Sequence, residues 1–280
     1  MLKDITLGQY YPADSIIHKL DPRTKLSATL IFVISLFLFN NISGFILITA
    51  FLVLAIKTSK VPFRYMSKGL KGIVFLFLIT AVFNLFLTPG LPIEQLMLFK
   101  ANLFGKEIWF FKISYAGVKN TALMTVRLVY LVLGTTIVTL TTTPNRLTDG
   151  MEKALRPLSK IKVPVHEVAM MMSIALRFIP ILIEETDKIM KAQIARGADF
   201  ENGNIFQKAK NMIPLLVPLF VSAFRRSYDL GMAMEARCYH GGEGRTKMNP
   251  LKYEKRDGST YLILLLYVVA VFLLRRYSPI

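Results

Sequence analysis

Hydrophobic residues run almost without interruption through the first half of the chain, and short polar groups divide them into segments. No charged residue lies between Lys25 and Lys57, and the middle of this stretch reads FNNISG at 39–44. Asparagine, serine and glycine favour turns, and the stretch is longer than the ~20 residues that cross a bilayer as one helix. The pattern therefore predicts a hairpin of two short apolar helices, with Lys25 and Lys57 snorkelling to the same membrane surface.

Three further apolar segments have the character of membrane spans: 72–87, which stops at TPG, 122–143, which stops before Pro144, and 258–274. Arg127, in the first turns of the 122–143 segment, is interpreted as a snorkelling end residue. The segment before it mixes aromatic residues with lysines, and we expect Trp109 at headgroup level. The sequence thus predicts an all-α integral membrane protein, a helical bundle of about four to five spans.

Residues 144–257 follow a different pattern, because charged residues alternate with apolar ones at helical spacing. Two long amphipathic helices are predicted here, one after Pro164 and one from about 211 to 238. We expect Pro180 to kink the first, and Pro214 and Pro218 to kink the second. The chain then divides into N-terminal membrane helices with a basic loop (1–143), an amphipathic region on the cytoplasmic side (144–257) and a C-terminal membrane helix (258–280).

Charge sets the expected orientation. The chain carries 35 Lys and Arg against 18 Asp and Glu, a net charge of +17. Beside long apolar runs, this excess indicates a cytoplasmic membrane face rather than nucleic-acid binding. The 57–71 loop is basic and holds no acid, so we expect it, the N-terminus and 144–257 in the cytoplasm. With five spans, Arg275 and Arg276 would lie outside, which fits badly with the preference of basic residues for the cytoplasmic side.

A single cysteine, Cys238, excludes an internal disulfide.

Motifs for catalysis or cofactor binding are incomplete. His166 and Glu167 form half of an H-E-x-x-H zinc motif, but Met170 stands where the second histidine would be, so we expect no metal site. No G-x-S-x-G and no G-x-x-x-x-G-K-[ST] occurs. We therefore expect no enzyme activity, no bound cofactor and no ATP binding by this chain itself.

One motif appears twice, at the end of each long amphipathic pattern, as Ala-x-x-Ala-Arg followed by a small residue. The copies consist of Ala192, Ala195, Arg196 and Gly197, and of Ala233, Ala236, Arg237 and Cys238. An arginine in a last helical turn can simply complement the helix dipole, and Gly197 suits the position after a helix. Alternatively, the alanines clear one helix face, so that the guanidinium can enter a groove of another protein and make a forked contact.

Together with an N-terminal stretch, these motifs resemble a known family. GQYYPADSIIHKLDPRTKL, ARG at 195–197 and EARCYHGGEGRT at 235–246 occur in the order seen in the T component of energy-coupling factor (ECF) transporters, the EcfT/CbiQ family, although Cys238 stands where glycine is common. The resemblance implies a non-catalytic subunit of a prokaryotic cell-membrane importer of vitamins or metal ions. It joins two cytoplasmic ABC-type ATPase subunits to a small membrane S component that binds the substrate.

The resemblance also implies roles for individual residues. The helix ends that would dock with the ATPases comprise Ala195, Arg196, Gly197, Ala236, Arg237 and Cys238. Contacts between the two helices, or with the S component, are expected at Ala192, Ala233, Pro180 and Pro218. The competing interpretations are a self-sufficient secondary transporter, which would need charged residues near mid-membrane, and a membrane-bound enzyme.

Overall fold

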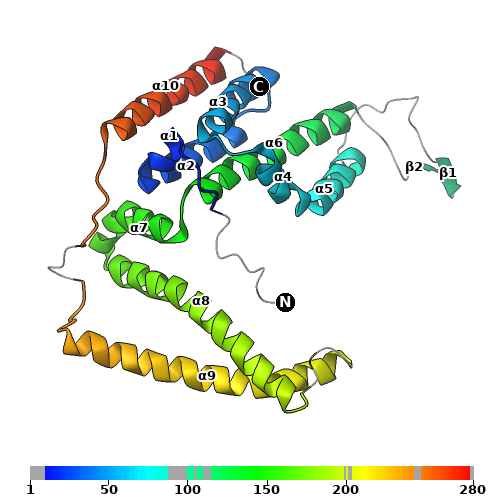
Figure 1. Cartoon of the computed structure of the whole chain (residues 1–280). Coiled ribbons are helices and arrows are strands. Elements are labelled where there is room, and N and C mark those ends of the chain that lie inside the picture. The colour runs from blue at the N-terminus through cyan, green and yellow to red at the C-terminus, as the bar shows by residue number, and fades with distance from the viewer. Residues whose placement is uncertain are drawn as a thin grey trace. The chain divides into compact units, whose positions relative to one another are not determined.

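The computed structural model describes residues 10–87, 100–103, 106–109, 115–198, 200, 204–242 and 247–277. They fold as two units. The first contains Tyr10–Thr143 and the chain from Lys252 onward, and the second contains Pro144–Leu251. Helices dominate both units, which confirms the predicted fold class (Figure 1).

Among the described residues of the first unit, eight helices and strands precede its C-terminal helix. In chain order the unit contains α1 (Ile16–Lys19), α2 (Pro22–Leu38), α3 (Ile42–Ser59), α4 (Phe63–Lys71), α5 (Val74–Leu87), β1 (Lys100–Leu103), β2 (Lys106–Trp109), α6 (Tyr115–Thr141) and α10 (Lys255–Tyr277). The two strands form a small antiparallel hairpin in which Lys100 pairs with Trp109, an element that the sequence did not predict. The headgroup position expected for Trp109 concerns a side chain outside the described part of the structure.

The predicted helical hairpin is confirmed, with the break at residues 39–41. α2 ends at Leu38, and Asn41 has the extended backbone of a residue that precedes a helix. Gly44 makes this turn compact, because a Cβ at this position would lie 2.3 Å from Cγ of Phe39. The two helices then pack with α6 and α10 around fully buried Leu36 and Ile48.

Arg127 does not snorkel, so the interpretation of this residue was wrong. Its side chain is buried, and it donates hydrogen bonds to the carbonyl oxygens of Leu36 (3.0 Å) and Phe39 (2.8 Å) and to the side chain of Asn40 (2.9 Å). The last carbonyl groups of a helix have no partner within the helix. Arg127 supplies that partner to α2 from the neighbouring helix α6, which costs less than leaving those groups unpaired in hydrocarbon.

The prediction that Lys25 snorkels to the membrane surface was also wrong, because its side chain is buried. Lys57, the other lysine of that prediction, is exposed. The Lys25 ammonium donates to the carbonyl oxygen of Thr141 at 2.9 Å and to the hydroxyl of Thr142 at 3.1 Å, both at the end of α6. Ordered oxygen atoms therefore replace water around this charge.

A buried carboxylate that the sequence analysis did not single out joins the start of α10 to the start of α2. Asp257 accepts hydrogen bonds from the backbone N–H of Asp21 (2.9 Å) and the hydroxyl of Thr24 (3.1 Å), and from the N–H of Glu254 (2.9 Å). Asp21 itself caps α2 through the N–H of Arg23. The Asp-Pro-Arg-x-Lys stretch is therefore the point at which α2, α6 and α10 meet.

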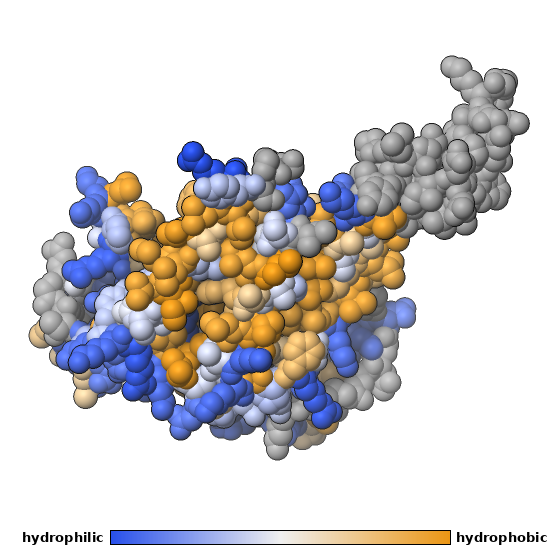
Figure 2. Space-filling view, turned by 90° about the horizontal axis from the view of Figure 1, so that it is seen from above, coloured by the Kyte–Doolittle hydropathy of each residue, from blue (hydrophilic) through white to orange (hydrophobic). Residues whose placement is uncertain are grey.

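Apolar side chains gather on the visible face of the molecule in Figure 2. The exposed apolar residues of the first unit include members of α5 (Val74, Phe75, Leu78, Phe83), α2 (Leu30, Ile34, Phe37) and α10 (Leu262, Leu265, Leu266, Phe272). Apolar surface on this scale is typical of contact with lipid. Among the described residues, three helices are long and apolar enough to cross a membrane, within α6, α8 and α10. The bent pair α4–α5, with a 57° angle, makes four if it counts as one span.

The second unit contains α7 (Pro144–Leu155), the 3-10 turn η3 (Arg156–Ile161), α8 (Val165–Ala195) and α9 (Ile205–Ala236). α8 and α9 are the two long amphipathic helices that the sequence predicted. α8 also qualifies as a membrane span by length and composition, because its N-terminal half is much more apolar than the charged half that ends at Ala195. Asn204 opens α9 with a capping box, in which its side chain and that of Gln207 bond each other's backbone N–H groups.

Candidate docking site

Both Ala-x-x-Ala-Arg motifs end their helices with the same backbone geometry. After Ala195, Arg196 is the cap and Gly197 adopts a left-handed conformation (φ +88°), with hydrogen bonds from Gly197 N–H to the Ile194 carbonyl (2.9 Å) and from Ala198 N–H to the Gln193 carbonyl (3.0 Å). This pair of bonds is the Schellman motif. It reverses the chain directly after the arginine.

The second helix repeats that arrangement without a glycine. Arg237 is the cap of α9, Cys238 adopts the left-handed conformation (φ +53°), and Tyr239 N–H bonds the carbonyl of Met234 at 3.0 Å. A side chain at a left-handed position costs roughly 1–2 kcal/mol. The chain therefore tolerates some strain in order to end both helices alike.

The side chains around the two ends are open to solvent. The exposed set comprises Ala192, Ala195, Arg196, Gly197, Ala233, Ala236, Arg237 and Cys238. Among the described residues, the guanidinium group of neither Arg196 nor Arg237 has a hydrogen-bond or ion-pair partner, although the backbone N–H of each closes its helix. Each end thus presents a guanidinium group on a surface of small side chains, which is suited to a carboxylate or to carbonyl oxygens of another protein.

α8 and α9 run in opposite directions and cross, so that the two arginines lie at opposite ends of the pair (Figure 1). At the crossing, Glu185 of α8 accepts hydrogen bonds from Ser222 (2.7 Å) and Arg226 of α9. Ten residues separate the crossing from each helix end (185 to 195 and 226 to 236). At ~1.5 Å per residue, the two arginines lie on the order of 30 Å apart.

A proline in α9 leaves a backbone carbonyl group free to bond with α8. Pro180 lies inside α8, and Pro214 and Pro218 lie inside α9, and both helices continue through them. Pro218 has no N–H for the carbonyl group of Pro214 four residues earlier. That carbonyl instead accepts a hydrogen bond from Nε2 of Gln193, on α8, at 3.4 Å. A side chain two residues before Ala195 is thereby hydrogen-bonded to the N-terminal third of α9.

A charged cluster joins the N-terminal end of α8 to the segment that follows Arg237. Lys247 donates to Asp149 at 2.6 Å and to Glu152 at 2.5 Å, both on α7, and Glu152 also pairs with His166 Nδ1 at 2.9 Å. Partial burial opposes ionisation of Glu152, but hydrogen bonds from Lys247 and His166 outweigh it and hold the pKa of this carboxyl below its usual value. Burial likewise opposes the charge of Lys247, and its bonds to Asp149 and Glu152 prevail and raise its pKa.

The same cluster accounts for one glycine of the EARCYHGG stretch. A Cβ on Gly242 would lie 2.2 Å from Cδ2 of His166, so only glycine fits against the imidazole ring. His166, the half of a zinc motif in the sequence, is thus part of an ion-paired cluster. Sequence reasoning did not find Asp149, Glu152 or Lys247, because they are brought together by tertiary folding and no local motif marks them.

Comparison with known proteins identifies the family of this chain. Residues 13–248 match the family described as CbiQ, cobalt transport protein. The chain is 55% identical over 276 residues to the energy-coupling factor transporter transmembrane protein EcfT of Clostridium kluyveri, covering 98% of both chains. It is 46% identical to the protein of the same name from Bacillus subtilis, over 98% of this chain and 100% of the relative. The chain belongs to the EcfT/CbiQ family and is a multi-pass transmembrane component of an energy-coupling factor transporter.

Proposed function

We propose that this chain is the non-catalytic coupling subunit of an ATP-driven importer, and that it connects two cytoplasmic ABC-type ATPases to a substrate-binding S component. The observation that carries the proposal is the pair of exposed arginines, Arg196 and Arg237, at two helix ends of identical geometry. A folding role alone does not require the same end twice, with strain accepted at Cys238 in the second copy.

The separation of the two ends favours two ATPase subunits rather than one. Guanidinium groups on the order of 30 Å apart cannot share one groove, whereas each can enter the equivalent groove of a paired subunit. The bonds of Glu185 to Ser222 and Arg226 tie α8 to α9. Relative motion of the two ATPases would therefore change the angle between α8 and α9. That change would pass to the S component that lies on these helices. The residues expected near the contacts between the helices, or with the S component, are Ala192, Ala233, Pro180 and Pro218.

We place the chain in the cell membrane of a prokaryote, with the N-terminus and 144–257 in the cytoplasm. Support comes from the segment around α4, which is basic and contains no acidic residue, as is typical of cytoplasmic loops. Its basic residues are Lys57, Lys60, Arg64, Lys68 and Lys71. Lys25 joins the start of α2 to the end of α6, and Asp257 joins the start of α2 to the start of α10. These three helix ends would therefore all lie on the cytoplasmic side of the membrane.

A secondary transporter is the weaker interpretation. Such a protein uses intramembrane charges for its substrate or coupling ion. Arg127, a charge within α6, is instead occupied by the carbonyl groups of Leu36 and Phe39 and by Asn40. A structural task thus explains this residue fully.

The single cysteine of the chain provides a direct test. Cys238 is exposed beside Arg237, so a photoactivatable maleimide on its sulfur should cross-link to an ATPase subunit in membranes. In a Cys238→Ser background, the same probe on Gly197→Cys should cross-link to an ATPase at the other helix end. A matched probe on Ser159→Cys, in the exposed turn η3, is the control. Cross-linking from 159 alone, with none from 238 and 197, would refute the proposal.

A further inference from the structure

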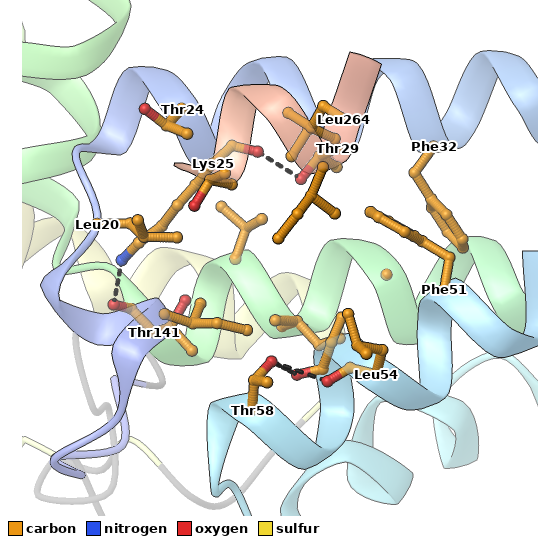
Figure 3. Close-up of a pocket in the computed structure, with 18 of the residues that line it drawn as sticks. Leu20, Thr24, Lys25, Thr29, Phe32, Phe51, Leu54, Thr58, Thr141 and Leu264 are labelled. Carbon is orange, nitrogen blue, oxygen red and sulfur yellow. Dashed lines mark hydrogen bonds between the residues drawn. The ribbon is translucent and has the colours of Figure 1, made fainter. Parts of the chain in front are cut away.

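A cavity of about 310 Å³ opens inside the first unit, away from the docking ends. Side chains of α2, α3, α6 and α10 line it, with α1 at one end (Figure 3). Three lining residues, Ile16, Leu54 and Ile263, are exposed at the surface of the bundle. The cavity is therefore open to whatever surrounds these helices, which is the bilayer.

The walls of the cavity present few free hydrogen-bonding groups to water. The hydroxyl of Thr29 bonds the carbonyl of Lys25 (2.8 Å), and that of Thr58 bonds the carbonyl of Leu54 (2.8 Å), as Figure 3 shows. Most other lining side chains are aliphatic or aromatic. A buried water needs two to four polar partners, so an apolar occupant is favoured over water along most of this cavity.

One end of the cavity is polar. Lys25 and Thr141 both line it there, and the buried hydroxyl of Thr141 has no hydrogen-bond partner among the described residues. Exposed cations lie within about one turn of this end, on the termini of two lining helices: Lys57 and Lys60 at the end of α3, and Lys255 and Arg256 at the start of α10. An occupant with a polar, anionic end next to an apolar chain matches this distribution.

The length of the cavity agrees with such a molecule. Along α2 the lining residues extend from Thr24 to Phe32, which is ~12 Å of helix. One leaflet contributes about 15 Å, half of the ~30 Å hydrocarbon core. The volume is also about twice that of a ~150 Å³ cavity that holds benzene, so it accommodates a long alkyl chain.

We propose that this cavity binds one acyl chain of a phospholipid from the leaflet next to α1. The chain lies along α2 towards Phe32, and the phosphate lies near the cations at the ends of α3 and α10. The site depends only on insertion of the first unit into a membrane, so its failure would leave the coupling role untouched.

The test is photolabelling of the full chain, in the complex it forms, in vesicles of phosphatidylglycerol that carry a diazirine near the end of one acyl chain. Labelled positions, mapped by mass spectrometry, should concentrate on the deep wall of the cavity, at residues 28–32, 51–55 and 134. Ala55→Leu, which fills the cavity from α3, should lower this labelling several-fold. Ala50→Leu, the same change at an exposed position of α3 outside the cavity, should leave it unchanged.

Two results would overturn the proposal. One is labelling of the exposed faces of α5 and α10 with no excess on the cavity wall, which would mean that lipid stays outside or that a protein segment fills the space. The other is equal labelling of the Ala55→Leu and Ala50→Leu variants. The wild-type map decides the question even if the Ala55→Leu variant folds poorly.

Discussion

The ammonium nitrogen of Lys25 lies 2.9 Å from the carbonyl oxygen of Thr141, so a side chain of α2 completes the last turn of α6. The same nitrogen also donates to the hydroxyl of Thr142 and to the carbonyl oxygen of His18. One buried charge therefore holds together the N-terminal segment, α2 and the end of α6, which immediately precedes the second unit.

Replacing Lys25 by Met should destabilise the protein while leaving the apolar stem in place. Hydrogen bonds to charged groups contribute about 1.5–3 kcal/mol, and the acceptors left behind would be buried. We expect a lower unfolding temperature in detergent, measured by intrinsic fluorescence. Lys57→Met, at an exposed position of α3, should change it little, and equal effects of the two substitutions would contradict the assigned role of Lys25.

Replacing Cys238 by Gly should stabilise the end of α9. The left-handed conformation costs roughly 1–2 kcal/mol for a residue with a Cβ, and the greater freedom of glycine in the unfolded chain offsets ~0.4–1 kcal/mol of that. A net gain of ~0.5–1 kcal/mol remains, whereas Cys238→Val should destabilise, since β-branched residues avoid this conformation. Unfolding of the three proteins, measured side by side, should rank Gly above Cys and Cys above Val, and any other order counts against the end geometry.

Glu152 should make stability dependent on acid pH. Its pKa is lower in the folded than in the unfolded protein, for which the ordinary value is 4.5. Its contribution is therefore complete well above pH 4.5 and is lost as the pH falls below that value through the folded pKa. The difference in unfolding temperature between wild type and Glu152→Gln should be largest near pH 7 and should vanish in acid.

Glu235→Gln is the control for that experiment, since Glu235 is exposed near the end of α9. Its unfolding temperature should follow the wild type across the whole pH range. A Glu152→Gln difference that persists unchanged below pH 4 would show that the amide disrupts packing rather than the ion pair with Lys247 and the hydrogen bond with His166.

Local sequence signals predicted the helical framework well. The break at Asn40 and Asn41 and the end of α8 just before Gly197 follow from the conformational preferences of those residues. The docking role of Arg196 and Arg237 remains a prediction, because it concerns surfaces that belong to other proteins.

The buried charges were not predictable in the same way. Snorkelling describes a cation on a helix surrounded by lipid, but Lys25 and Arg127 meet carbonyl groups from helices that are distant in sequence, 116 residues away in the case of Lys25 and Thr141. Lys247 and Glu152 are separated by 95 residues. Such pairs follow from tertiary packing, and a pattern of 3.6-residue periodicity carries no information about them.

We propose that Arg196 and Arg237 each dock with an ATPase, and reversal of their charges distinguishes docking from simple capping of the helix ends. Loss of one partner of a buried charged pair costs on the order of 2–5 kcal/mol, whereas loss of an exposed helix-end contact costs ~0.3–1 kcal/mol. The measurement is the amount of ATPase that co-purifies with the Arg196→Glu, Arg237→Glu and doubly substituted chains, together with uptake of the transported substrate. Arg225→Glu, an exposed arginine on α9, is the control. We predict impaired uptake for each single variant, loss of both ATPases from the double variant and normal behaviour of the control. A double variant that keeps its ATPases and its uptake would show that these two arginines do not dock with the ATPases.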